Sequence, residues 1–297
     1  MTFNSLVDGE LARAQIDPLA LERLIGAALD EDLRYGPDVT SDATVRADAC
    51  AVGDVVARAR GVICGVPVAL AILDVAGIPL DGVSVTARDG DQVEPGTVVL
   101  SVLGPLREML LVERTLLNFM THLSGIATAT QAWVQALDGT GCTVRDTRKT
   151  LPGLRELEKY AVRCGGGENH RMGLGDMALI KDNHLVATGG VVEAIRAVRS
   201  VAPDIELEVE CDTLDQVREA VLAGSQHLLL DNMDLDQLKA AVTIAREGPG
   251  VRLEASGGMN LANARAVAQT GVDYIAVGAL THSSLALDLA FDLRVQT

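Results

Sequence analysis

The sequence predicts an α/β protein, an incomplete (β/α) barrel with a smaller N-terminal α+β domain. Between residues 142 and 279, short apolar runs end at a charged residue or a glycine pair, and helix-like stretches follow them. A strand that ends in a polar residue and turns into a helix is the unit of a (β/α) barrel. Before residue 103, strand-like runs follow one another with turn signals between them. The two patterns therefore predict two domains of different class.

The N-terminal domain is predicted at residues 1–124. Apolar residues at helical spacing indicate a helix at 19–29, and Gly36 followed by Pro37 breaks this pattern. Strand-like runs, separated by Asp-Gly and Pro-Gly turn signals, follow at 55–59, 61–64, 83–87 and 98–102. A helix-favouring stretch at 108–137 then links this domain to the next.

The barrel domain is predicted at residues 125–284, and residues 285–297 are expected to return to the N-terminal domain. Strand candidates centre near Val144, Leu179, Leu207, Leu229, Leu253 and Ile275. Apolar residues at helical spacing indicate helices between them, at 191–201, 214–223, 235–246 and 261–270. A full barrel has eight strands in about 250 residues, so these strands indicate an incomplete one. A doubly wound open sheet is the alternative. The barrel is favoured because candidate functional residues follow nearly every strand.

Composition excludes several classes of protein. The chain has 297 residues, enough for one large domain or two moderate ones. No apolar window approaches the roughly 20 residues that span a bilayer, and residues 1–8 lack the pattern of an export signal. We therefore expect a cytoplasmic protein that does not act on membranes. A net charge of −16 and 2% aromatic residues disfavour a nucleic-acid surface.

Two further features of composition bear on ligands. Between residues 145 and 184, eight Arg or Lys residues stand against six Asp or Glu residues, which favours a pocket for a small anion inside an acidic protein. The cysteines are odd in number and scattered, at Cys50, Cys64, Cys142, Cys164 and Cys211. This spacing disfavours a disulfide framework or a structural zinc site, so we expect buried thiols that act as small hydrophobic groups.

Acidic residues stand at two neighbouring strand ends. Glu208 and Glu210 lie on the same side of one strand, and Asp231 ends the next. Such carboxylates can hold a Mg²⁺ ion that also binds a diphosphate, or stabilise a sugar cation. The simpler alternative is that one glutamate pairs with a basic residue at a neighbouring strand end.

Glycines follow the last two predicted strands. In barrels of this type the final strand loops often bind a phosphate through backbone N–H groups. Glycines also make plain turns, so both roles stay open for this set. It comprises Ser256, Gly257, Gly258, Val277, Gly278 and Ala279.

A basic set lies between the first two predicted strands and just after the second. It comprises Arg148, Lys149, His170, Arg171 and Lys181. Several converging cations indicate a ligand with more than one negative group, because arginine grips carboxylates through paired hydrogen bonds. Three consecutive glycines at 165–167 indicate a loop that approaches the ligand closely.

These motifs, taken together, resemble the quinolinate phosphoribosyltransferase family over nearly the whole chain. The resemblance rests on the runs at 113–118, 122–128, 146–150, 165–171, 180–184 and 276–278. It implies a reaction of quinolinate with phosphoribosyl pyrophosphate in NAD biosynthesis, with Mg²⁺ as cofactor. It also implies a homodimer in which each active site draws on both subunits.

The resemblance also implies roles for particular residues. The catalytic set is Lys149, Lys181, Glu210 and Asp231, the last two of which would face the ribose and its Mg²⁺. Arg148, His170 and Arg171 would hold quinolinate, with Arg114 reaching in from the neighbouring subunit. Thr147 belongs to the same substrate-binding set. The glycine-containing segments at 256–258 and 277–279 would hold the 5'-phosphate.

Three other functions are compatible with parts of the pattern. A Schiff-base aldolase would use Lys181 as its nucleophile, but leaves the acidic pair and the arginines without a role. A phosphate-sensing protein could keep the barrel without the chemistry. A relative that acts on another acidic heterocycle, as in the ModD-like proteins, would share the fold.

Overall fold

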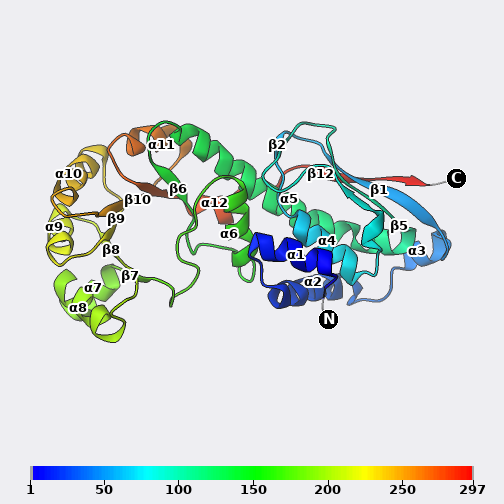
Figure 1. The fold of residues 1–297 in the computed structure, drawn as a ribbon, viewed down its shortest axis with the longest axis horizontal. Coiled ribbons are helices and arrows are strands. Elements are labelled where there is room, and N and C mark those ends of the chain that lie inside the picture. Colours follow the sequence, from blue (N-terminus) through cyan, green and yellow to red (C-terminus); the bar gives the residue numbers. More distant parts are fainter. Residues whose placement is uncertain (1–2, 296–297) are drawn as a thin grey trace. The chain divides into compact units, whose positions relative to one another are not determined.

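The structure is a computed structural model that describes residues 3–295, and the chain divides into two compact units (Figure 1). The N-terminal unit consists of Met1–Ala129, Leu151–Gly166 and Ser283–Thr297. The barrel unit consists of Thr130–Thr150 and Gly167–His282. The chain thus passes from the barrel unit into the N-terminal unit and back between residues 150 and 167. The boundaries expected from the sequence, at residues 124 and 284, stay a prediction.

The N-terminal unit begins with the helices α1 (Ser5–Ala14), α2 (Pro18–Leu33), α3 (Val39–Thr44) and α4 (Val66–Val75). The first three begin after a residue whose side chain caps the helix, whereas α4 follows Gly65. The side chain of Asp17 accepts a hydrogen bond from the Leu19 amide, and Pro18 opens α2, which buries Leu21 and Ile25. Helix α4 is buried along most of its length. It has no polar face, so apolar spacing could not reveal it.

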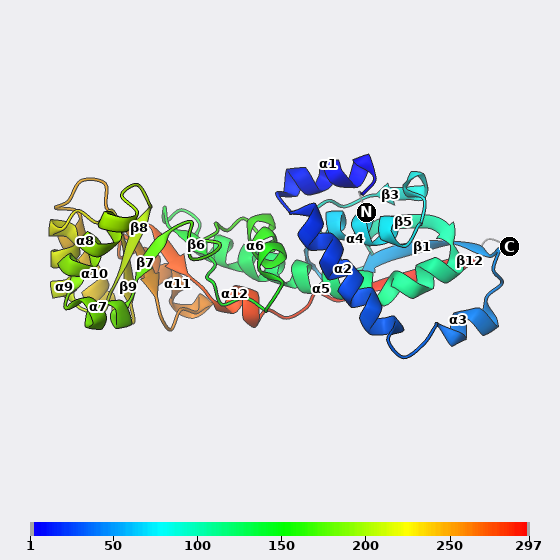
Figure 2. The same ribbon diagram turned by 90° about the horizontal axis from the view of Figure 1, so that it is seen from below.

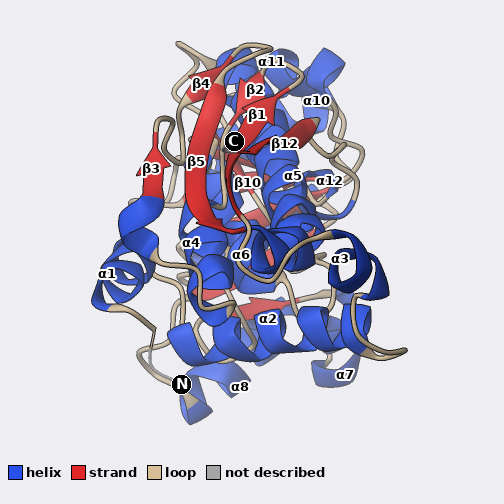
Figure 3. Ribbon diagram, turned by 90° about the vertical axis from the view of Figure 1, so that its right-hand side faces the viewer, coloured by secondary structure: helices blue, strands red, loops and turns tan. Residues whose placement is uncertain are grey.

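The N-terminal unit contains an antiparallel sheet with strand order β12-β1-β5-β3. Its strands are β1 (Cys50–Ala57), β3 (Val83–Val85), β5 (Val98–Pro105) and β12 (Leu289–Val295). Strand β12 pairs with β1 from Ala57↔Leu289 to Ala51↔Val295, and Figure 3 shows the two side by side. The short pair β2 (Gly61–Val62) and β4 (Gln92–Val93) lies apart from this sheet, and a 3-10 turn spans Leu80–Gly82.

Two further helices link parts of the chain. Helix α5 (Leu106–Leu137) runs for 32 residues, which confirms the predicted long helix. Its first residues belong to the N-terminal unit and its last to the barrel unit. Helix α6 (Arg155–Cys164) belongs to the N-terminal unit, although it lies in sequence between two barrel strands.

The barrel unit has a six-stranded parallel sheet, which confirms the incomplete barrel. The strands are β6 (Thr143–Arg145), β7 (Ala178–Ile180), β8 (Leu207–Cys211), β9 (His227–Asp231), β10 (Arg252–Ser256) and β11 (Tyr274–Ala276). Their order is β7-β8-β9-β10-β11-β6, sequential from β7 to β11. A doubly wound sheet reverses its strand order at a switch point, whereas this sheet continues in one direction. Within residues 3–295, β6 and β7 do not pair, so the barrel is open there.

Helices follow the strands of this unit. They are α7 (Asp182–Thr188), α8 (Val191–Val201), α9 (Leu214–Leu222), α10 (Leu235–Ala245), α11 (Leu261–Ala268) and α12 (Ala279–His282). Capping boxes at Thr213, Asp234 and Asn260 fix the starts of α9, α10 and α11. Figure 2 shows α8, α9 and α10 along one side of the strands. The four predicted helices of this region are confirmed to within about two residues.

No helix in residues 3–295 is long and apolar enough to cross a membrane.

Candidate active site

A cavity of about 380 Å³ lies at the carboxyl ends of the parallel strands. Nine of the predicted site residues line it, together with four that were not predicted. The lining residues are Thr147, Arg148, Lys149, His170, Arg171, Leu179, Lys181, Glu210, Leu229, Asp231, Glu254, Ser256 and Ala276. All belong to the barrel unit. The strand ends therefore bring the predicted basic and acidic sets to one place.

Strand register places the acidic groups. Asp231 and Ser256 are the last residues of β9 and β10 and lie opposite each other in the ladder. Glu210 lies one position before the end of β8, and Lys181 directly follows β7. The Lys181 ammonium nitrogen lies 2.6 Å from a Glu210 carboxylate oxygen. This pair bears out the simpler alternative for Glu210 without removing it from the cavity.

The loop after β6 carries Thr147, Arg148 and Lys149. The Lys149 amide donates to Thr147 Oγ1 over 3.0 Å, and the Lys149 carbonyl accepts from the buried Thr281 hydroxyl over 2.9 Å. The Nε atom of Arg148 is buried and has no hydrogen-bond partner among the described residues. A buried donor without a partner is costly, so this atom marks a position where a ligand acceptor belongs.

His170 and Arg171 reach the cavity from an extended segment beside β6. Glu168 forms a parallel bridge with Arg145, which aligns this segment with the strand. The His170 amide then donates to the buried Asp146 carboxylate over 3.0 Å. The Arg171 guanidinium donates to the Met177 carbonyl over 3.1 Å. Burial, and next the charge of Arg148, lower the pKa of Arg171, so two cations stand close together in the cavity.

A buried cluster of charged side chains contacts the His170 imidazole. Its Nε2 atom lies 2.7 Å from a Glu208 oxygen and 3.8 Å from a Glu254 oxygen, and all three side chains are almost fully buried. Arg145 lies 3.4 Å from Glu254 and over the ring of Tyr274. The cluster thus balances two basic side chains against two buried carboxylates.

The charges of this cluster shift the proton equilibria of its members. Burial alone would lower the pKa of His170. The hydrogen bond to Glu208 and the charges of Glu254 and Glu208 outweigh burial and raise this pKa above its ordinary value. Burial, followed by the charge of Glu208, raises the pKa of Glu254 to about 7. The cluster therefore favours a protonated imidazole in the wall of the cavity.

The glycine segments lie beside the cavity, and among them only Ser256 is a lining residue. Gly257 has a positive φ of 87°, and a Cβ there would lie 2.2 Å from Asn232 Oδ1. A Cβ on Gly278 would lie 2.9 Å from the Lys149 side chain and 3.4 Å from His282 Nε2. Gly257 thus needs glycine both for its backbone conformation and for close approach, whereas the nearest atom at Gly278 belongs to the flexible Lys149 side chain. The other members of the predicted phosphate set are Gly258, Val277 and Ala279.

The structure does not place Arg114 in this cavity. Arg114 lies on α5 in the N-terminal unit, with a side chain 68% exposed. Its nearest acidic partner is Glu113, at 3.8 Å. The predicted role of Arg114 requires a second subunit and stays a prediction.

Sequence reasoning missed Arg145, Glu254 and His282 as parts of the site. Glu254 could have been found, because it alternates with Ser256 and so faces the same side of β10. His282 lies on the turn after Gly278 and carried no sequence signal of its own.

The carboxylates at the acidic end of the cavity could supply some, but not all, of the ligands of a Mg²⁺ ion. Glu210 and Asp231 both line the cavity, and Asp231 also accepts a hydrogen bond from the Asn232 side chain. Burial, then the charges of Asp231 and Asp182, raise the pKa of the nearby Asp212, which indicates a negative potential at this end. Two carboxylates fit an ion whose remaining ligands are phosphate oxygens and water.

Comparison with known proteins identifies the family. Residues 38–124 match the family model described as the N-terminal domain of quinolinate phosphoribosyl transferase, and residues 126–292 match its C-terminal domain. The chain belongs to the quinolinate phosphoribosyltransferase family.

Relatives from several organisms support this membership. The Nicotinate-nucleotide pyrophosphorylase (carboxylating) of Mycobacterium leprae is 53% identical over 273 residues, covering 91% of this chain and 95% of that protein. A Bacillus subtilis protein described as a probable enzyme of the same name is 39% identical, covering 93% and 94%. The crystal structure of NadC from Streptococcus pyogenes matches with a TM-score of 0.88 at 36% identity, covering 95% of this chain and 99% of that one.

Membership of the quinolinate phosphoribosyltransferase family agrees with the geometry of the cavity and not with an aldolase site. A Schiff-base lysine needs a desolvated amine. Lys181 instead is 46% exposed and forms a close ion pair with Glu210.

Proposed function

We propose that the chain transfers the phosphoribosyl group of phosphoribosyl pyrophosphate to quinolinate, with loss of one carboxylate. The products are nicotinate mononucleotide, pyrophosphate and carbon dioxide. The observation that carries this proposal is the single cavity in which the buried, unpartnered Nε of Arg148 lies with four further basic side chains and with Glu210 and Asp231. Such a cavity provides cations for a dicarboxylate and carboxylates for a metal diphosphate. The names of the relatives agree with this reaction.

The basic wall of the cavity suits the acceptor. Arg148, His170 and Arg171 would bind the two carboxylates of quinolinate, and Thr147 would contact it beside them. The proximity of Arg148 to Arg171 supports this role, because two neighbouring cations are stabilised by an anion between them. The hydrogen bond from His170 to Glu208 fixes the imidazole in place before the acceptor arrives.

The remaining lining groups suit the phosphoribosyl donor. Lys149 and Lys181 would contact its phosphate groups. Backbone N–H groups of the segments 256–258 and 277–279 would bind its 5'-phosphate. Glu210 and Asp231 would hold Mg²⁺, directly or through water, and the ion would neutralise the diphosphate of the donor.

The chemistry follows from these positions. The bond between ribose C1 and pyrophosphate breaks, and positive charge develops on C1. Glu210 and Asp231 stabilise that charge through a field that is already in place. The pyridine nitrogen of quinolinate then bonds to C1. The ring becomes cationic and accepts the electron pair left by the departing carbon dioxide, and the ring carbon takes up a proton.

We further propose that the working unit is a homodimer with shared sites. Arg114 is exposed and lies outside the cavity of its own chain, which supports a role in the site of a partner. A mixture of Arg114→Ala and Lys181→Ala subunits should recover part of the activity, because some heterodimers then hold one intact site. A mixture as inactive as each variant alone would contradict a shared site. We expect this enzyme to act in the cytoplasm.

An activity toward another acidic heterocycle, as in ModD-like proteins, is not favoured by the names of the relatives. The test is product analysis by mass spectrometry, with phosphoribosyl pyrophosphate and either quinolinate or nicotinate, in the presence and absence of Mg²⁺. Nicotinate mononucleotide and carbon dioxide should form in equal amounts from quinolinate when Mg²⁺ is present. The absence of both products in a folded protein would contradict the proposal.

A further inference from the structure

Two cysteines and an aspartate that are far apart in the sequence lie together in the N-terminal unit. The sulfur atoms of Cys64 and Cys164 and a carboxylate oxygen of Asp89 all lie within 4.8 Å of one another. Cys64 is fully buried, and the other two residues are half-buried. The scattered spacing of the cysteines disfavoured a zinc site and predicted buried thiols that act as small hydrophobic groups, so this cluster arises from the fold and not from a local motif.

The backbone and neighbouring side chains hold the three groups in place. The Asp89 carboxylate accepts from the Gly65 and Val66 amides, each over 2.9 Å, at the start of α4. It also accepts from the Tyr160 hydroxyl over 2.8 Å. The Cys64 amide donates to the buried Ser124 hydroxyl over 2.9 Å, and Cys164 is the last residue of α6. The cluster is thus built on fixed elements, as a metal site requires.

The groups of the cluster oppose one another's ionisation. Burial, the hydrogen bond with Cys164 and the charge of Asp89 raise the pKa of the Cys64 thiol well above its usual range. Burial also raises the pKa of Asp89, against the effect of its hydrogen bonds. Burial, and next the charge of Asp89, raise the pKa of Tyr160.

We propose that Cys64, Asp89 and Cys164 form a binding site for a thiophilic divalent cation, of which Zn²⁺ is the best match, with water as its fourth ligand. Zinc bonds of about 2.3 Å to sulfur and about 2.1 Å to oxygen place tetrahedral ligands roughly 3.6 to 3.8 Å apart. The three candidate ligand atoms all lie within 4.8 Å of one another, a range from which one ion can draw all three as ligands. Thiolate ligands select zinc over Mg²⁺ and Ca²⁺. Binding releases the two thiol protons to solvent.

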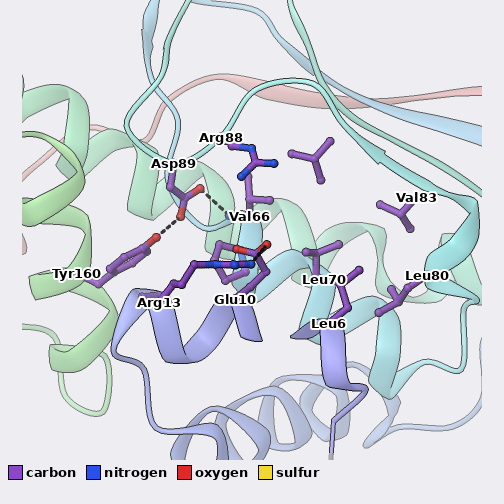
Figure 4. Close-up of a pocket in the computed structure, with 13 residues that line it drawn as sticks. Leu6, Glu10, Arg13, Val66, Leu70, Leu80, Val83, Arg88, Asp89 and Tyr160 are labelled. Carbon is purple, nitrogen blue, oxygen red and sulfur yellow. Dashed lines mark hydrogen bonds and ion pairs between the residues drawn. The ribbon is translucent and has the colours of Figure 1, made fainter. Parts of the chain in front are cut away.

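A cavity of about 420 Å³ reaches the Asp89 side of the cluster. Asp89 and Tyr160 line it, together with Glu10 and Arg13 from α1. Figure 4 shows the Asp89 carboxylate between the Tyr160 hydroxyl and the Val66 backbone at one end of this cavity. The Arg13 guanidinium lies 2.5 Å from a Glu10 carboxylate oxygen, so Glu10 partly neutralises the charge of Arg13 in this cavity.

The ion would act as a structural cross-link and would not touch the reaction. It would join the end of α6 to the Asp89 turn and to the start of α4. Helix α6 belongs to the segment Leu151–Gly166, which anchors the chain in the N-terminal unit between Lys149 and His170. A metal that binds only the folded chain stabilises it by mass action. Metal binding at this cluster does not depend on the proposed reaction.

The test uses the full-length protein, stripped of metal by a chelator under reducing conditions and then dialysed without Mg²⁺. Zn²⁺ binding is measured by titration and elemental analysis, and Co²⁺ reports the ligands through thiolate-to-cobalt charge-transfer absorption. The parent should bind about one equivalent with this absorption, and its melting temperature should rise. Cys164→Ser and Asp89→Asn should weaken binding at least about 10-fold, as should Cys64→Ser if it folds.

Two control variants separate this site from others. Cys50→Ser removes an exposed thiol, and Glu210→Gln alters the acidic end of the barrel cavity, so both should bind like the parent. Unchanged affinity in Cys164→Ser would overturn the proposal. So would a reduced, folded parent that binds neither ion.

Discussion

The Nε2 atom of His170 lies 2.7 Å from a carboxylate oxygen of Glu208, with both side chains almost fully buried. This contact joins the wall of the cavity to the interior of the barrel. A buried charge that loses its partner is left uncompensated, whereas an exposed one is solvated. The role of the pair in stability and in binding is therefore open to a direct test.

Glu208→Gln should lower the free energy of unfolding by about 3 kcal/mol and raise the KM for quinolinate more than it lowers kcat. The matched control is Glu206→Gln, since Glu206 also pairs with a histidine, His227 at 3.2 Å, but is 56% exposed. The control should change stability by less than about 1 kcal/mol. Urea unfolding and steady-state kinetics measure both effects. Equal effects in the two variants would contradict a supporting role for Glu208.

Titration of Glu254 should contribute to the pH dependence of the free energy of unfolding. Its pKa is raised from 4.5 to about 7 in the folded protein, so its proton stabilises the fold below pH 4.5, and this stabilisation is lost as pH rises toward 7. The raised pKa of His170 acts in the same direction at higher pH, above its ordinary 6.5. Unfolding free energies from pH 4.5 to 9 should fall more steeply in the parent than in Glu254→Gln. Parallel profiles would refute this assignment.

Lys181→Met should lower kcat/KM by roughly 10- to 150-fold, because a charge-assisted hydrogen bond to a phosphate contributes about 1.5 to 3 kcal/mol. The matched control is Lys239→Met, since Lys239 is exposed, pairs with Asp236 and lies outside the cavity. Its kcat/KM should stay within about 2-fold of the parent. A similar loss in both variants would show that the effect is not local.

Substitutions at two neighbouring glycines can distinguish the cost of backbone strain from the cost of a steric clash. Gly257 and Gly258 both have positive φ, but a new Cβ meets Asn232 at 2.2 Å only at Gly257 and nothing within 4 Å at Gly258. Gly258→Ala should therefore cost about 1 kcal/mol of stability from strain alone. Gly257→Ala should cost more and also raise the KM for phosphoribosyl pyrophosphate, because Asn232 contacts Asp231. Identical kinetics in the two variants would count against a phosphate site here.

Local patterns predicted the barrel better than the N-terminal unit. The barrel strands are short apolar runs that stop at or near a polar residue or a glycine, so their positions could be predicted directly. Strand β12 pairs with β1 from the opposite end of the chain, and no local pattern specifies that pairing. Helix α1 was also missed, although its cap, Asn4, precedes it.

The same distinction holds for the site. Lys181, Glu210 and Asp231 stand at strand ends, which converge in any parallel barrel. In the cluster under His170, Glu254 could have been found from its alternation with Ser256, whereas the contact of Arg145 with Glu254 joins two strands far apart in the sequence and has no local signal. The contact between Cys64 and Cys164 depends on the path of α6 into the N-terminal unit, which the sequence does not reveal.

The proposed reaction requires the basic wall of the barrel cavity to bind a dicarboxylate acceptor. The most direct measurement compares kcat/KM for quinolinate and for nicotinate in the parent and in Arg148→Met, which removes the buried, unpartnered donor. The parent should turn over quinolinate and not nicotinate, and the variant should lose about 100-fold or more in kcat/KM for quinolinate. A parent that prefers nicotinate, or a variant that keeps its activity on quinolinate, would contradict the binding of a dicarboxylate by this wall.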